Sequence, residues 1–348
     1  MTTSSTRQSH IPLRQMLYGH IDQLDLALDQ LALRDANFDR FAILLVDNVV
    51  ELTLHRYAVD QKATFNPWDK SGQSQINPKV LGDALGQKFD AKVALASQTG
   101  LLSKPMSQSI NWLHTFRNTS YHSGLRHEGI LNSLANLYLR ICCDLLAEYK
   151  PRFWSSGAEK MSHRAAKYLG STEVTLSAWI TKNPFDEAWA RLKSVALSMN
   201  CSLIADLARD MGATIQSVDD QINHGVAYKV SHLESHPRDV VVTEAQFMAL
   251  AYSKKGVEYA KENGYAGTGG PSLQTWFRQH YKLQISTDPI PKWRERLGKL
   301  EKEKDEHAGL NKYCNFIQQT HSIRDDISQQ NEFFWREIDD YSERFKPR

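Results

Sequence analysis

The chain has 348 residues, which is enough for two domains of ordinary size. Hydrophobic residues make up 41% of it and charged residues 24%, which is typical of a globular protein and excludes a disordered one. The formal net charge is only +2, so any contact with nucleic acid would require a local basic patch. The longest strongly apolar stretch, 41–50, is too short for a membrane span, and residues 1–10 show no secretory signal. We therefore expect a cytoplasmic protein with no membrane partner.

Helical periodicity dominates the first 150 residues, where apolar side chains recur at every third or fourth position. The predicted helices cover residues 13–33, 38–59, 79–97, 107–119 and 130–149. Residues 64–79 are rich in Asn, Pro, Ser and Gly and predict a loop. Pro151 would end the last helix, because proline cannot continue a helical hydrogen-bond ladder. This pattern predicts an all-α fold that begins with an up-and-down helical bundle over residues 11–150.

Residues 151–348 differ in character and predict a mostly helical C-terminal domain whose role the sequence does not assign. The predicted helices cover residues 177–200, 243–264 and 272–281, with two more between 291 and 345. Val240–Val242 predicts a short strand, because β-branched residues favour extended backbone. Residues 203–224 have the spacing of a helix-turn-helix, although Asp219 and Asp220 in its second helix would repel phosphate. We therefore favour a packing corner as the interpretation of that segment, with the helix-turn-helix as the alternative.

No cofactor or metal is expected. The four cysteines have no C-x-x-C spacing, so we interpret them as reduced core thiols rather than as zinc ligands or a disulfide framework. They are Cys142, Cys143, Cys201 and Cys314. The glycine-rich loop at 267–270 is not followed by the Gly-Lys-Ser/Thr of a nucleotide-binding P-loop.

One short segment combines residue types suited to a single reaction. Arg117 is a permanent cation whose fork of donors suits phosphate. His122 can exchange a proton near neutral pH, and Asn118 can both donate and accept hydrogen bonds. On a straight helix, Arg117 and His122 lie about 140° apart around the axis. They would therefore share a cleft only if the helix is distorted near Gly124 or if a second copy of the chain completes the site.

Neighbouring residues supply candidates for a supporting role. Asp47 and Glu51 lie one turn apart on the second predicted helix, and carboxylates of this kind can position an arginine and set the charge of a histidine. A solvated acidic stripe is the alternative. Tyr121 and Arg126 flank the histidine within the motif. The other two histidines of the segment, His114 and His127, are expected to be exposed polar residues without a direct role.

The sequence Arg117-Asn118-x-x-x-His122 resembles the Arg-x4-His motif of the HEPN ribonucleases, in which an asparagine often follows the arginine. The setting is also similar, because the motif lies between the last two helices of a helical bundle. The resemblance covers residues 11–150 and implies a metal-independent RNA endonuclease. His122 would be the catalytic acid or base, Arg117 would bind the scissile phosphate, and Asn118 would orient His122 or the phosphate.

The same resemblance implies partners. RNA would be the substrate, and its 2′-hydroxyl would attack the adjacent phosphate to leave a 2′,3′-cyclic end. The protein would act as a homodimer through its N-terminal bundle, with the two motifs face to face. Many members are toxins or phage-defence effectors with an antitoxin or regulatory protein. Some antitoxins modify a tyrosine two residues after the histidine, a position that Gly124 occupies here.

Two other functions remain open from the sequence. In the first, the chain is a non-catalytic helical module that binds RNA or a protein, and Arg117 and His122 belong to a structural network. In the second, it is a DNA-binding regulator that uses the candidate helix-turn-helix at 203–224.

Overall fold

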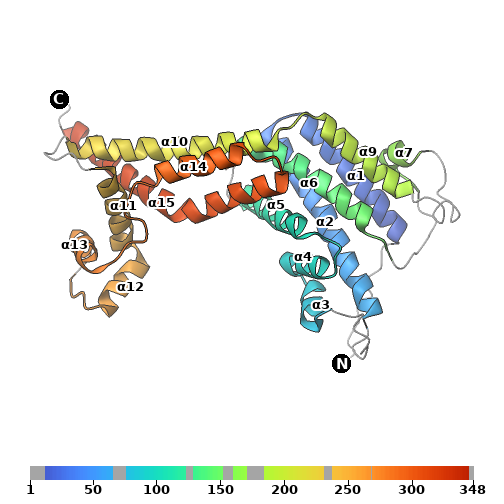
Figure 1. The fold of residues 1–348 in the computed structure, drawn as a ribbon, viewed down its shortest axis with the longest axis horizontal. Coiled ribbons are helices and arrows are strands. Elements are labelled where there is room, and N and C mark those ends of the chain that lie inside the picture. The colour runs from blue at the N-terminus through green and yellow to red at the C-terminus, as the bar shows by residue number, and fades with distance from the viewer. Residues whose placement is uncertain are drawn as a thin grey trace. The chain divides into compact units, whose positions relative to one another are not determined.

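A computed structural model describes residues 12–65, 76–122, 128–151, 160–170, 184–230, 237–267 and 269–344. Within these residues the chain forms fourteen α-helices and no β-strand, which confirms the predicted all-α class (Figure 1). The chain divides into two compact units. Unit 1 comprises Met1–Asp206 with Asp305–Asn311, and unit 2 comprises Leu207–Lys304 with Lys312–Arg348. This division differs from the expected one between residues 150 and 151.

Unit 1 is built around α2, which packs against α1, α4, α5 and α6. Its helices are α1 (Leu13–Ala32), α2 (Ala36–Thr64), α3 (Pro78–Ala84), α4 (Phe89–Gln98), α5 (Lys104–His122), α6 (Glu128–Glu148), α7 (His163–Leu169) and α9 (Pro184–Ser198). The stripe predicted on α1 is buried, as Leu17, Ile21 and Leu24 illustrate. Asp35 caps the N-terminus of α2 by accepting the backbone N–H of Asn37 at 2.9 Å.

The helix predicted over 79–97 is two helices, α3 and α4. The break falls at Gly86, whose backbone N–H bonds the carbonyl of Asp83 at 3.1 Å in a turn. Glycine is a weak helix former, because it loses more backbone entropy than other residues when it is ordered. A Cβ at this position would lie 3.2 Å from the Asp83 carbonyl oxygen, so the turn also favours a residue without a side chain.

Helices beyond residue 151 complete the core of unit 1. The carboxylate of Asp25 on α1 is 3% exposed and binds three side chains of α7. The Tyr168 hydroxyl donates to it at 2.6 Å and the Lys167 ammonium at 2.8 Å, and Arg164 also contacts it. Helix α9 packs against α6 and α1. The first turn of α15 belongs to unit 1 as well, because Glu306 forms a bidentate pair with Arg140 at 2.6 and 2.8 Å.

Among the described helices, α6 alone has the length and apolar composition of a membrane span. Its most apolar 18-residue window is 78% buried inside the fold, as is typical of a core helix. Helices α2 and α9 both pack against it, and Arg140 near its middle reaches Glu306. The helix predicted over 130–149 is therefore present and forms part of the core.

Unit 2 contains the remaining helices: most of α10 (Leu203–Val230), then α11 (Arg238–Tyr252), α12 (Lys254–Glu262), α13 (Pro271–His280), α14 (Ile290–Glu301) and most of α15 (Glu306–Arg344). The strand predicted at Val240–Val242 is wrong, because these residues lie in α11. Val241 packs where α10 presents Gly225, and a Cβ there would lie 2.6 Å from a methyl of Val241. Close packing of this kind outweighs the β preference of valine.

The candidate helix-turn-helix is also wrong. Residues 203–224 lie inside α10, which is one unbroken helix of 28 residues. Gly212, the expected turn residue, lies within the helix, and a Cβ there would meet a methyl of Leu297 at 3.6 Å. This glycine faces a neighbouring helix instead of ending its own, so the segment cannot place a recognition helix as that motif requires.

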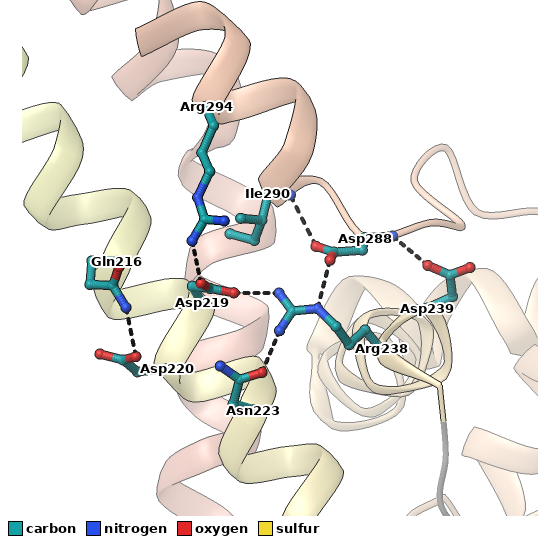
Figure 2. A network of polar contacts seen from close by, with 9 residues as sticks. All are labelled: Gln216, Asp219, Asp220, Asn223, Arg238, Asp239, Asp288, Ile290 and Arg294. Atoms are coloured by element: carbon teal, nitrogen blue, oxygen red, sulfur yellow. Dashed lines mark hydrogen bonds and ion pairs between the residues drawn. The ribbon is translucent and has the colours of Figure 1, made fainter. Parts of the chain in front are cut away.

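A polar network centred on Arg238 joins three parts of unit 2 (Figure 2). From the start of α11, its guanidinium donates to Asp219 on α10 at 2.5 Å and to Asp288 at 2.6 Å, and it also bonds Asn223. Asp219 accepts a second arginine, Arg294 on α14, at 2.6 Å. Asp288 in turn caps α14 by accepting the backbone N–H of Ile290 at 3.0 Å. The network fixes α10, α11 and α14 to one another.

Candidate functional site

The motif residues lie at the C-terminal end of α5, which remains a regular helix through its last residue, His122. The distortion that would bring His122 toward Arg117 is therefore absent between these two positions. On a regular helix they stay about 140° apart around the axis. The side chains of Tyr121 and His122 lie outside the described part of the chain, as does the whole of Arg126.

Arg117 is held at the surface by two neighbours. Its Nε lies 3.4 Å from Oδ2 of Asp47, within ion-pair distance, and its Nη1 donates to Oδ1 of Asn118 at 2.8 Å. The side chain is 37% exposed, so the guanidinium is fixed on one side and open on the other. The structure thus places Asp47 and Asn118, two of the residues singled out in the sequence, beside Arg117. Donors that remain open in this way could contact a phosphate.

Asp47 is the centre of this arrangement. It projects from α2, is 1% exposed, and accepts the Tyr138 hydroxyl of α6 at 2.7 Å. His114 of α5 bonds the same carboxylate through Nδ1, at 2.9 Å from Oδ1 and 3.2 Å from Oδ2. With Arg117, three side chains from two helices compensate one buried charge. A carboxylate removed from water requires such partners, because its desolvation is otherwise very unfavourable.

His114 is not the exposed polar residue that was predicted. Its side chain is 17% exposed, and its ring stacks flat on Phe89 of α4, with centroids 3.7 Å apart and planes within 4°. A carboxylate only accepts hydrogen bonds, so the bond to Asp47 places the ring proton on Nδ1. No group among the described residues bonds the second nitrogen, Nε2. The ring is therefore fixed in plane and in rotation, with one nitrogen left available.

Tyr138 completes the network as a neutral donor. Burial, together with the charge of Asp47, raises the pKa of Tyr138 well above its usual value. The hydroxyl therefore keeps its proton and remains a hydrogen-bond donor. Sequence reasoning missed this residue, because an aromatic within an apolar helix is usually a core residue. It missed His114 as well, although the spacing of three residues between His114 and Arg117 on one helix was a signal that both could reach one partner.

The expected acidic stripe separates into two parts. Glu51, one turn after Asp47 on α2, pairs with Lys92 of α4 at 3.3 Å and does not join the Arg117 contacts. Lys92 is a nearly buried lysine with 3% of its side chain exposed. Burial and then the charge of Lys92 lower the pKa of His55, an effect that Glu51 opposes. The site residue on this helix is therefore Asp47, and Glu51 supports the packing of α4.

Within the described ranges, no group of three or more His, Cys, Asp or Glu side chains is arranged to hold a metal ion. The cysteines Cys142, Cys143, Cys201 and Cys314 are free thiols, and burial raises the pKa of each of them. Comparison with protein-family models, with curated proteins and with solved structures found no match to this chain.

Proposed function

We propose that unit 1 carries a metal-independent RNA endonuclease site of the HEPN type. Arg117 binds the scissile phosphate, His122 is an acid or base, and Asn118 orients the guanidinium. One observation carries the proposal: a buried carboxylate, Asp47, fixes Arg117 at the surface with part of its guanidinium open. The histidine of the motif follows on the same helix, α5.

The proposed reaction is a transesterification. The 2′-oxygen of the RNA bonds to the adjacent phosphorus, and the bond from phosphorus to the 5′-oxygen breaks. The products are a 2′,3′-cyclic phosphate and a 5′-hydroxyl. Arg117 would stabilise the negative charge that develops on the phosphate oxygens, an electrostatic contribution that is usually among the largest in such catalysis. His122 would exchange a proton with one of the two oxygens.

The active form in this proposal is a homodimer through the N-terminal bundle. A regular α5 separates Arg117 from His122 around its axis, so a second copy would supply the missing partner to each site. The cytoplasm is the proposed location. An antitoxin or regulatory protein is the proposed partner, and unit 2 would recognise it or another trigger. The biological role would be that of a toxin or a phage-defence effector.

The test is cleavage of total RNA in the presence of EDTA. Wild type should leave 2′,3′-cyclic ends, and Arg117→Ala and His122→Ala should each lower the rate by roughly 10²- to 10⁴-fold. Lys254→Ala serves as the matched control, since this lysine of unit 2 is 90% exposed. Equal cleavage by all four proteins would exclude the proposed site.

Mixing the two inactive variants tests the dimer. If each site combines Arg117 of one copy with His122 of the other, Arg117→Ala and His122→Ala subunits form one intact site per heterodimer. A statistical mixture should then regain about a quarter of the wild-type activity. A site contained in one chain would give no recovery.

Expression should also arrest growth, and His122→Ala should relieve the arrest if the protein is a toxin.

A non-catalytic module that binds RNA or a protein is the second candidate. The observation in its favour is that Arg117 already has Asp47 and Asn118 as partners, as an arginine in a structural network would. It predicts that RNA is retained on a filter in a salt-dependent manner without any cleavage, and that Arg117→Ala weakens retention while His122→Ala does not.

A further inference from the structure

We propose that His114 is a second proton-transfer residue of this site and that Asp47 is its positioning residue. The inference rests on the proposed function and deepens it, because it assigns the base that the motif alone does not supply. His114 would accept the proton of the 2′-hydroxyl through Nε2. His122 would then be the acid that protonates the leaving 5′-oxygen.

His114 lies close to Arg117, the residue that we propose to bind the phosphate. His114 and Arg117 are three residues apart on α5, which places them about 60° apart around the axis and about 4.5 Å apart along it. Both side chains contact Asp47, the ring at 2.9 Å and the guanidinium at 3.4 Å. A phosphate bound by Arg117 would therefore lie near the imidazole, whereas His122 lies on another side of the helix.

The imidazole of His114 is held in one tautomer. Asp47 accepts from Nδ1, so the neutral ring carries its lone pair on Nε2, the form that a general base requires. Phe89 lies flat against one face of the ring and prevents it from turning. A histidine that served only to join helices could bond through both nitrogens, but here Nε2 has no partner among the described residues. The 17% exposure of the side chain leaves an edge accessible.

The charged groups near the His114 ring suit it to accept a proton. Among the described residues, the titratable and charged groups around this cluster are Asp47 and Glu51 from α2, Arg117 from α5, and Tyr138 and Cys142 from α6, while α4 presents the uncharged Phe89. The buried carboxylate would stabilise the imidazolium that forms when Nε2 takes a proton. The second hydrogen bond of Asp47, from Tyr138, keeps the carboxylate in place during that change.

The proposed step balances. As the 2′-oxygen bonds to phosphorus, its proton moves to Nε2 of neutral His114. As the bond to the 5′-oxygen breaks, protonated His122 gives its proton to that oxygen. His114 is left protonated and His122 neutral, and exchange with water restores both. No oxidant, reductant or further reactant is required.

The test replaces His114 with asparagine, whose amide nitrogen can still donate to Asp47 but cannot act as a base. His114→Asn should lower kcat by about 10²-fold and remove one ionisation from the pH–rate profile. The matched control is His321→Asn in unit 2. His321 also bonds a carboxylate through Nδ1, that of Asp325 at 2.8 Å, but both side chains are 57% exposed. This control should leave the rate and the profile unchanged.

An RNA oligonucleotide with sulfur in place of one scissile 5′-oxygen separates the two histidines. A thiolate leaves without protonation, so this substrate should relieve the defect of His122→Ala and not that of His114→Asn. Relief of both defects, or of neither, would overturn the assignment. Melting curves show whether the variant is folded, and His114→Gln replaces it if it is not. If neither amide variant folds, His114 is a structural residue and the inference is wrong.

The outcomes also separate this inference from the proposed function. If Arg117→Ala and His122→Ala lose cleavage while His114→Asn keeps its rate and pH profile, the inference fails and the proposed function stands. If wild type does not cleave RNA, or if the Arg117 and His122 variants cleave as well as it does, both fail together.

Discussion

The two units each contain a polar network, and the networks differ in the group at their centre. In unit 2, the central group is Arg238, which donates from all three of its nitrogens to Asp219, Asn223 and Asp288 (Figure 2). In unit 1, the central group is the carboxylate of Asp47, and two of its partners keep unused capacity. Arg117 is 37% exposed, and Nε2 of His114 is without a partner among the described residues.

This difference has a physical meaning. A network whose groups are all bonded fixes the helices that contribute to it and has little capacity left for a ligand. Arg238, bonded through all three nitrogens, has little such capacity left and holds three helices, although Arg294 at the edge of this network is 58% exposed. A network that is anchored by a buried charge and open at the surface presents oriented groups to solvent, as catalytic and binding sites do. We therefore propose the Asp47 network as the site of the chemistry and assign the Arg238 network to stability.

The largest effect is expected from removing the buried carboxylate. Asp47→Ala leaves Tyr138 and His114 without their hydrogen-bond acceptor and Arg117 without its ion-pair partner, which should destabilise unit 1 by about 3–5 kcal/mol, as for other broken buried ion pairs. Chemical denaturation followed by circular dichroism measures this. Asp144→Ala is the control, because Asp144 on α6 and its partner Lys193 on α9 are 41% and 36% exposed, so no buried charge is left behind. If Asp47→Ala were as stable as that control, the network would not hold the helices.

Acid should weaken unit 1 by a somewhat smaller amount through His20. Burial lowers the pKa of this core histidine to about 4, and its Nδ1 has no hydrogen-bond partner in the part of the chain that the structure describes. Below pH 6.5, His20 binds a proton in the unfolded chain but not in the folded chain. The free energy of unfolding therefore falls as the pH drops toward 4. The contribution of His20 to this loss should approach about 3 kcal/mol near pH 4, and it is opposed by Asp39, because burial raises the pKa of that carboxyl to about 6.

Denaturation curves between pH 7.5 and 4.5 measure this effect. His20→Leu removes the titrating group and should reduce the dependence on pH, even if it changes stability at neutral pH. An unchanged slope in His20→Leu would show that other groups cause the acid response. The same measurement on Asp47→Ala distinguishes the response of His20 from that of the network.

A smaller effect is expected at the centre of the other network. Arg238→Ala leaves Asp219 with Arg294 as its remaining partner and Asp288 with its helix-capping bond. Because these compensations remain, we expect unit 2 to lose about 2 kcal/mol. RNA cleavage should be unchanged at temperatures at which the variant is folded. A large loss of cleavage without a loss of stability would contradict the role in stability that we give to this network.

Helical periodicity was sufficient to predict α1, α2, α5 and α6, which each bury one face in the core of unit 1, but it did not separate α3 from α4 and did not predict α7. The stripe of Leu17, Ile21 and Leu24 is an example. The pattern failed where packing decided the structure. Val240–Val242 lie in a helix, and Val241 packs closely against Gly225 of α10. This contact joins distant parts of the chain, so the local sequence could not predict it.

The candidate site was predictable in part for the same reason. Arg117 and Asn118 are adjacent in sequence, and the motif places them together. Asp47 was singled out as a carboxylate on an early helix, yet its contacts with His114 and Tyr138 join three helices. Such contacts depend on how α2, α5 and α6 pack, so spacing along one helix could not predict them. The extent of unit 1 could not be predicted either. The sequence changes character after residue 150, yet Asp25 of α1 binds residues of α7 beyond that point.

Unit 1 is built from two chain segments that are far apart in sequence, so its parts are synthesised at different times. The apolar helix α6 leaves the ribosome before α9, which covers part of it, and long before Glu306, which pairs with Arg140. Until residue 311 has been made, unit 1 lacks its last segment. A nascent chain of this length would therefore expose apolar surface that chaperones or targeting factors bind.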